Sequence, residues 1–91
     1  MELKQFLHLL RQKDGITIQF SHLGYVVMRD GEILDQRGNH SPVKPITRTE
    51  RVRKVGNMYS AIASACRYMS GDLRALVGDL LACMASYKER R

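Results

Sequence analysis

The sequence contains no uninterrupted apolar run of about 18 residues, the length that a membrane-spanning helix needs. Its start lacks the basic segment followed by an apolar stretch that marks a secretory signal. The two cysteines, Cys66 and Cys83, lie far apart and have no Cys-x-x-Cys spacing. These absences predict a cytoplasmic protein that does not contact membranes and keeps both thiols reduced.

Groups suited to catalysis or metal binding are also scarce. The three histidines, His8, His22 and His40, fall in a predicted helix, a turn and a loop, and no spacing links them to the cysteines. No glycine-rich loop of the phosphate-binding type occurs. We therefore expect no enzymatic activity, no metal, no cofactor and no small-molecule substrate.

The composition is that of an ordinary folded protein. The chain has 91 residues, of which 44% are apolar and 26% charged, so one globular domain (1–91) is expected. A core of this size gives limited stability, and small domains are often supplemented by association. The pattern of apolar residues predicts an α+β fold with an N-terminal helix, an antiparallel β-meander and a C-terminal helical hairpin.

The N-terminal helix is predicted over residues 1–14, and Gly15 can close it in the left-handed conformation. Apolar residues at positions i, i+3, i+4 and i+7 line one face of it: Leu3, Phe6, Leu7 and Leu10. From Ile16 to Phe20 the apolar period changes to two, which is typical of a strand with one buried face.

Residues 16–37 predict a β-meander. Asp30-Gly31 is its strongest hairpin signal, because both central positions of a type I′ turn need a positive φ. A turn at residues 21–24 would divide the preceding stretch into two strands and give three in all. Without that turn, one long bent strand pairs with the last strand, and the sheet has two.

The second half of the chain predicts two helices. After a loop at 38–46, Thr47 and Glu50 have the spacing of a capping box, so a helix is predicted over 47–69. Gly56-Asn57 weakens helical propensity and can introduce a break or kink. Another helix is predicted over 72–88, followed by a basic tail at 89–91. The apolar seam of the helix at 47–69 consists of Val52, Val55, Tyr59, Ile62, Cys66 and Met69.

The helix at 72–88 is apolar on two opposed faces, one rich in leucine and one made of small residues. Such a helix is normally buried on both faces, so we predict a symmetric homodimer through the C-terminal helices. A monomer in which the first helix and the loop cover these faces is the alternative. The predicted interface comprises Ala75, Gly78, Ala82 and Ala85, with Ala61 and Ala65 as their partners within the chain or from a second copy.

The net charge of +6 is unevenly placed. Residues 1–41 and 58–86 are each neutral, 42–57 have an excess of four cations (five basic against one acidic residue), and the C-terminal end adds two. Cations in the first turns of a helix oppose its dipole, at a small cost that a bound polyanion would relieve. The alternative is a solvated face that happens to be basic. The residues expected to contact nucleic acid are Lys44, Arg48, Arg51, Arg53, Lys54, Asn57, Arg67, Arg90 and Arg91.

The leading hypothesis is a small basic accessory or regulatory protein that binds the phosphate backbone of DNA or RNA as a dimer. A helix-turn-helix is disfavoured because the last helix carries only Arg74 and Lys88 as basic residues. The alternative is a non-enzymatic protein-interaction module, an inhibitor or adaptor that docks on a larger protein partner. Small size, basic charge and the lack of an active site are typical of accessory proteins of phages and plasmids.

Overall fold

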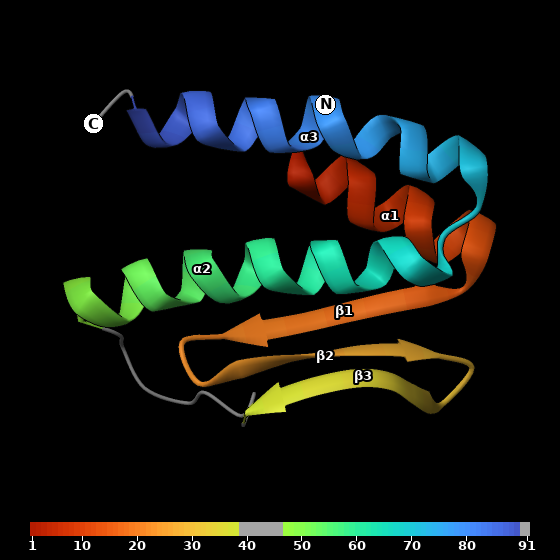
Figure 1. Cartoon of the computed structure of the whole chain (residues 1–91), viewed down its shortest axis with the longest axis horizontal. Helices are drawn as coiled ribbons and strands as arrows, with labels where there is room; N and C mark the ends of the chain where they lie inside the picture. The colour runs from red at the N-terminus through yellow and green to blue at the C-terminus, as the bar shows by residue number, and fades with distance from the viewer. Residues whose placement is uncertain (39–46, 90–91) are drawn as a thin grey trace.

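The computed structural model describes residues 1–38 and 47–89, and the side chains of these residues as far as Ala85. The elements in chain order are α1 (Leu3–Asp14), β1 (Ile16–Ser21), β2 (Gly24–Arg29), β3 (Glu32–Gly38), α2 (Arg48–Ala65), the 3-10 turn η1 (Cys66–Tyr68) and α3 (Gly71–Glu89). The predicted α+β fold is therefore confirmed, with one helix, three antiparallel strands and then two helices (Figure 1).

The sheet is a meander in the order β1-β2-β3. His22 and Leu23 form the first turn, so the three-stranded prediction is confirmed over the two-stranded one. Asp30 and Gly31 form the second turn with φ values of 52° and 83°, as a type I′ turn requires. A register shift between Val27 and Met28 brings Asp35 opposite Val27, on the helix side of the sheet.

The predicted alternation along β1 is present. Ile16 is buried, Phe20 is half-buried, and Thr17 and Gln19 between them are exposed. α1 packs its own apolar face beside β1, with Phe6 and Leu10 fully buried, and Gly15 ends this helix in the left-handed conformation. In Figure 1 the three helices lie to one side of the sheet.

α2 begins at the predicted cap, Thr47, and continues without interruption through Gly56 and Asn57. It ends at Ala65, earlier than the predicted position 69, and η1 completes the segment. Met69 then adopts an extended backbone, while the Arg74 side chain donates to the carbonyl oxygens of Cys66 and Met69. These hydrogen bonds satisfy carbonyl groups that a longer helix would otherwise have paired.

α3 runs back in the direction opposite to α2 and packs against α1 (Figure 1). No helix within 1–38 and 47–89 is long and apolar enough to cross a membrane. Cys66 and Cys83 are both free thiols. The core joins all three helices to β1 and β2 through Phe6, Leu10, Ile16, Tyr25, Val27, Ala61, Ile62, Ala65, Met69, Leu73, Val77 and Leu80.

Candidate nucleic-acid interface

The first turn of α2 is closed by a reciprocal pair of hydrogen bonds. The Glu50 backbone N–H donates to Thr47 Oγ1 at 3.2 Å, and the Thr47 backbone N–H donates to Glu50 Oε2 at 2.8 Å. The predicted capping box is therefore confirmed. One consequence concerns anion binding, because the Glu50 carboxylate already occupies this helix start. Any phosphate at this site must be held mainly by side chains.

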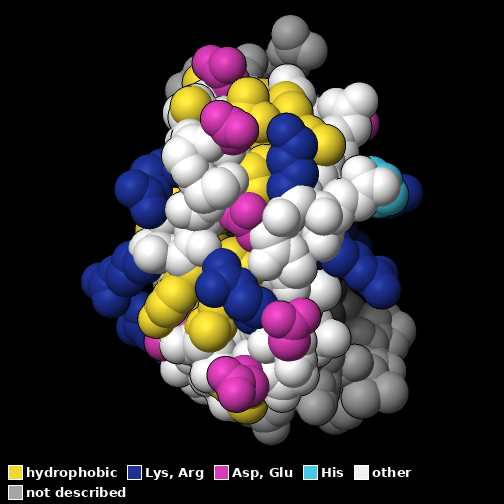
Figure 2. Space-filling model, turned by 90° about the vertical axis from the view of Figure 1, so that its right-hand side faces the viewer, with side chains coloured by type: hydrophobic (Ala, Val, Ile, Leu, Met, Phe, Trp, Pro, Cys, Tyr) yellow, Lys and Arg dark blue, Asp and Glu magenta, His cyan; other side chains and the backbone are white. Residues whose placement is uncertain are grey.

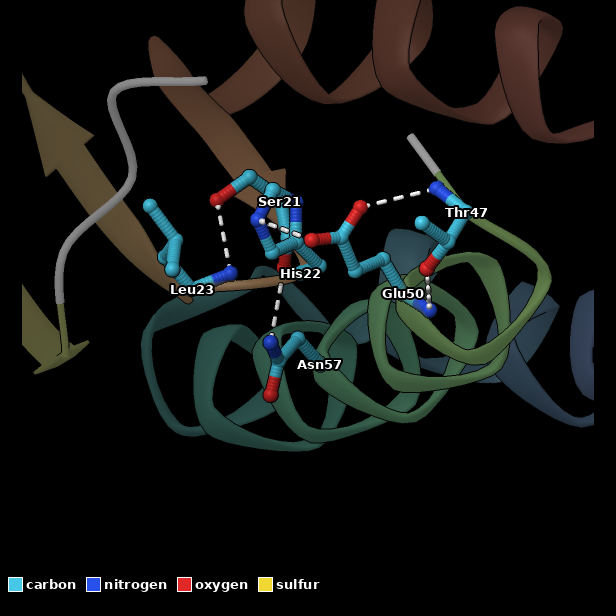
Figure 3. A network of polar contacts seen from close by, with 6 residues as sticks. All are labelled: Ser21, His22, Leu23, Thr47, Glu50 and Asn57. Carbon is cyan, nitrogen blue, oxygen red and sulfur yellow. Dashed lines mark hydrogen bonds and ion pairs between the residues drawn. The ribbon is translucent and has the colours of Figure 1, made fainter. Parts of the chain in front are cut away.

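The tip of the β1–β2 hairpin contacts the N-terminal part of α2 (Figure 3). His22 Nε2 lies 3.7 Å from Glu50 Oε1, and Asn57 Nδ2 donates to the Ser21 carbonyl oxygen at 2.7 Å. Within the turn, the Leu23 N–H donates to Ser21 Oγ at 3.1 Å. The hairpin and the start of α2 thus hold each other in place.

Glu50 is the one acidic residue among the cations of this segment, and it stays ionised. The N–H of Thr47 lowers the pKa of its carboxyl group most strongly, and the nearby charges of His22 and Arg53 lower it further. One oxygen of the carboxylate accepts the cap hydrogen bond from Thr47, and the other faces His22 of the hairpin.

Four cations surround this cap and are exposed. Among the described residues, Arg48, Arg51, Arg53 and Lys54 form no ion pair with a carboxylate. The Lys54 ammonium lies 5.9 Å from the centroid of the Phe20 ring on β1, within the range of a weak cation–π contact. We call these four residues the basic patch. Lys44, predicted to belong to it, lies outside the described residues.

The other end of the molecule has a different charge pattern. Figure 2 views the side where α2 ends and α3 begins, and there basic and acidic side chains are interspersed, with hydrophobic ones between them. Arg67, predicted to contact nucleic acid, lies in η1 at this end and is exposed. Roughly 25 Å of helix axis separate it from Arg48, so the fold does not bring it to the basic patch.

Asn57 lies next to the basic patch, half-buried, and its amide group is engaged with Ser21. Arg90 and Arg91 fall outside the described residues. In Figure 1 the C-terminal end of α3 lies at the same end of the molecule as the start of α2.

The six predicted interface residues separate into two groups. Ala61 and Ala65 are fully buried in the core of the chain itself. The four small residues of α3 are exposed, and a Cβ atom built on Gly78 would meet nothing within 4 Å. No backbone of the described chain therefore approaches Gly78. The exposed residues are Ala75, Gly78, Ala82 and Ala85, and we call them the small-residue face.

A polar cluster that the sequence analysis did not single out ties β3 to α2. The Tyr25 hydroxyl donates to Asp35 Oδ2 at 3.0 Å, and the Ser64 hydroxyl donates to the same oxygen. These bonds lower the pKa of Asp35, with Ser64 the larger cause, while burial and the carboxylate raise the pKa of Tyr25. The sequence signal was weak, since an aspartate in a strand is ordinary unless the register is known.

No group of three or more His, Cys, Asp or Glu side chains that would hold a metal ion occurs in the part of the chain that the structure describes. The carboxylate of Asp35 is instead occupied by hydroxyl groups, and that of Glu50 by the helix cap and His22. Compared with known proteins, the chain matches no family model, no curated protein and no solved structure.

Proposed function

We propose that this protein is a small basic accessory or regulatory protein that binds nucleic acid through the basic patch. One observation carries the proposal: Arg48, Arg51, Arg53 and Lys54 are all exposed without a carboxylate partner among the described residues. In the first turn of a helix, an exposed cation such as Arg48 is disfavoured by about 0.3–1 kcal/mol at low ionic strength, and the four cations also repel one another. A row of phosphates would remove that repulsion and accept hydrogen bonds from the guanidinium groups.

The mode of contact follows from the cap. The N–H groups of Thr47 and Glu50 are engaged in the cap, and the Glu50 carboxylate repels anions there, so we expect the arginine side chains to supply most of the phosphate contacts. Such binding depends on charge, releases counterions and weakens steeply as salt rises.

The test compares two charge-reversal variants by fluorescence anisotropy, with DNA and RNA at several salt concentrations. Arg51→Glu with Arg53→Glu alters the basic patch, and Lys4→Glu with Arg11→Glu alters exposed cations of α1. Both change the net charge from +6 to +2, because each reversal removes two charges. We expect the patch variant to lose binding and to reduce the slope of log K against log salt by about two. The α1 variant should retain both.

Two results would refute the proposal. Absence of binding by the unaltered protein at low salt is one. An equal loss in both variants is the other, because it would show that net charge alone, and not the patch, attracts the nucleic acid.

We also propose that the protein forms a homodimer through the small-residue face of α3, which would present two basic patches. The exposure of Ala75, Gly78, Ala82 and Ala85 supports this, since small side chains let two helices approach closely. The open space at Gly78 means that packing within the described chain does not require a glycine there.

A second candidate function is a protein-interaction module that docks on a larger partner. Three large apolar side chains favour it, because Leu23, Ile33 and Val52 are 44%, 56% and 56% exposed. A pull-down from cell lysate with and without nuclease separates the two candidates. A partner retained after nuclease treatment favours the module, and loss of all partners favours nucleic acid.

A further inference from the structure

An apolar strip lies on α2 close to its first basic residues. It consists of Val52, Val55 and Tyr59, which follow one another at helical spacing. Val52 is 56% exposed, and Val55 and Tyr59 are half-buried. Met58 and Cys66 of the same segment pack against the buried core, whereas these three side chains do not.

Tyr59 differs from the other tyrosines whose side chains are described. The hydroxyl groups of Tyr25 and Tyr68 hold β3, through Asp35 and the Leu34 carbonyl oxygen respectively. The Tyr59 hydroxyl has no hydrogen-bond partner within the described chain. Tyr59 is half-buried, and its hydroxyl group takes no part in the hydrogen bonds of the described chain.

The apolar strip is bordered by the cations of the basic patch. Arg48 precedes Val52 by four residues and Arg51 precedes Val55 by four, so each arginine lies one turn before an apolar residue on the same face. Arg53 is exposed on the other flank of Val52. The surface therefore combines a short apolar platform with unpaired positive charge on two sides.

A polyanion with flat apolar parts is complementary to such a surface. Duplex DNA hides its base faces and is read through polar side chains in a groove, but the Asn57 amide is engaged with Ser21 and the Ser64 hydroxyl with Asp35. A single strand exposes its base faces, which stack on aromatic side chains while cations follow the phosphates. A partner helix fits less well, because the strip has three side chains only and borders Gly56.

From this charge complementarity we infer that the nucleic acid bound by the basic patch is single-stranded and is recognised without sequence readout. Bases stack on Tyr59 beside Val52, and the arginines contact the phosphates. The inference rests on the proposed function and narrows it to one substrate class.

The test uses anisotropy at low salt with three labelled probes: oligothymidine, the same strand paired with oligoadenosine, and an abasic oligomer of equal length. We expect oligothymidine to bind about fivefold or more tightly than the abasic oligomer, since stacking on one aromatic side chain has an effect of that size. The duplex should bind more weakly than the single strand.

Two variants locate the effect at Tyr59. Tyr59→Leu removes the aromatic ring but keeps apolar volume, and it should lower oligothymidine affinity to that of the abasic oligomer without changing the latter. Tyr59→Phe should retain the preference. Circular dichroism of both variants checks that the helices are intact.

The outcomes separate this inference from the proposed function. Equal binding of oligothymidine and the abasic oligomer, duplex binding as tight as single-strand binding, or no effect of Tyr59→Leu would each overturn the inference and leave charge-based nucleic-acid binding in place. Poly-glutamate binding as tightly as oligothymidine would also overturn it, in favour of an acidic protein partner. If no oligomer binds at low salt, both proposals fail.

Discussion

Asn57 and Ser64 lie on the side of α2 that faces the sheet, where they bond the Ser21 carbonyl oxygen and the Asp35 carboxylate. Asn57 was among the residues predicted to contact nucleic acid, and Ser64 follows it by seven residues, on the same face of the helix. A helical wheel gives the relative directions of side chains, but it does not say which direction meets the strands. The hydrogen-bonding partners lie far away in sequence, so only the tertiary fold reveals them.

At the residue scale, Asp35→Asn should flatten the response of stability to acid. The pKa of Asp35 is lowered, first by Ser64 and then by Tyr25. Because the folded pKa lies below the unfolded value of about 3.9, the carboxylate contributes stability above that value and loses it as pH falls through the folded pKa. Near pH 7 we expect the free energy of unfolding to fall by about 1–2 kcal/mol.

The measurement is urea unfolding of the protein and the Asp35→Asn variant at a series of acidic pH values. Asp79→Asn, at an exposed position on α3, is the matched control and should follow the unaltered protein. An Asp35→Asn variant that loses stability in acid as steeply as the unaltered protein would contradict the role given to this cluster.

Gly78→Ala should stabilise the single chain by about 0.5–1 kcal/mol, because alanine favours a helix and the added Cβ meets no atom within 4 Å. Gly24→Ala is the contrasting variant. There φ is 151° and the new Cβ would lie 1.9 Å from the Arg37 carbonyl oxygen. The free energy of unfolding should therefore decrease. Thermal unfolding at a concentration where the protein is monomeric gives both values, and a destabilised Gly78→Ala would contradict the exposure of this face.

At the scale of elements, α2 depends on its cap, because it starts with cations that oppose its dipole. Thr47→Ala removes the hydroxyl that accepts from the Glu50 N–H and should cost about 1 kcal/mol of stability. Amide hydrogen exchange should become faster at Glu50. Thr49→Ala, exposed in the same turn, is the control. Equal exchange in the two variants would show that the cap does not hold this helix start.

The starts and turns of elements were predicted well, whereas the end of α2 was not. The Asp30-Gly31 turn and the Thr47 cap depend on residues within four positions of each other, so local chemistry is sufficient. The end of α2 at Ala65 involves Arg74, whose side chain reaches back from α3 to the carbonyl oxygens of Cys66 and Met69. The apolar seam continues to Met69 and therefore predicted a longer helix. It contains no indication that Arg74 bonds these carbonyl oxygens.

At the scale of the whole molecule, four exposed cations gather at the start of α2, while the opposite end mixes basic and acidic side chains (Figure 2). The proposed homodimer would carry two such patches. Light scattering after size-exclusion chromatography should give twice the chain mass of 10.4 kDa. Ala82→Glu on the small-residue face should return it to one chain. A protein that is already a monomer of 10.4 kDa at high concentration would refute the dimer.

The sequence by itself determined the order of the elements, the Asp30-Gly31 turn, the cap of α2 and the excess of positive charge, because each depends on side-chain period, turn chemistry or composition over a few neighbouring residues. Only the tertiary structure decided that Asn57 and Ser64 face the sheet, that Arg67 lies far from Arg48, and that Ala61 is buried while Ala75 is exposed. These outcomes depend on which face of each helix meets the strands. Contacts between segments distant in sequence set that orientation, and no local pattern encodes it.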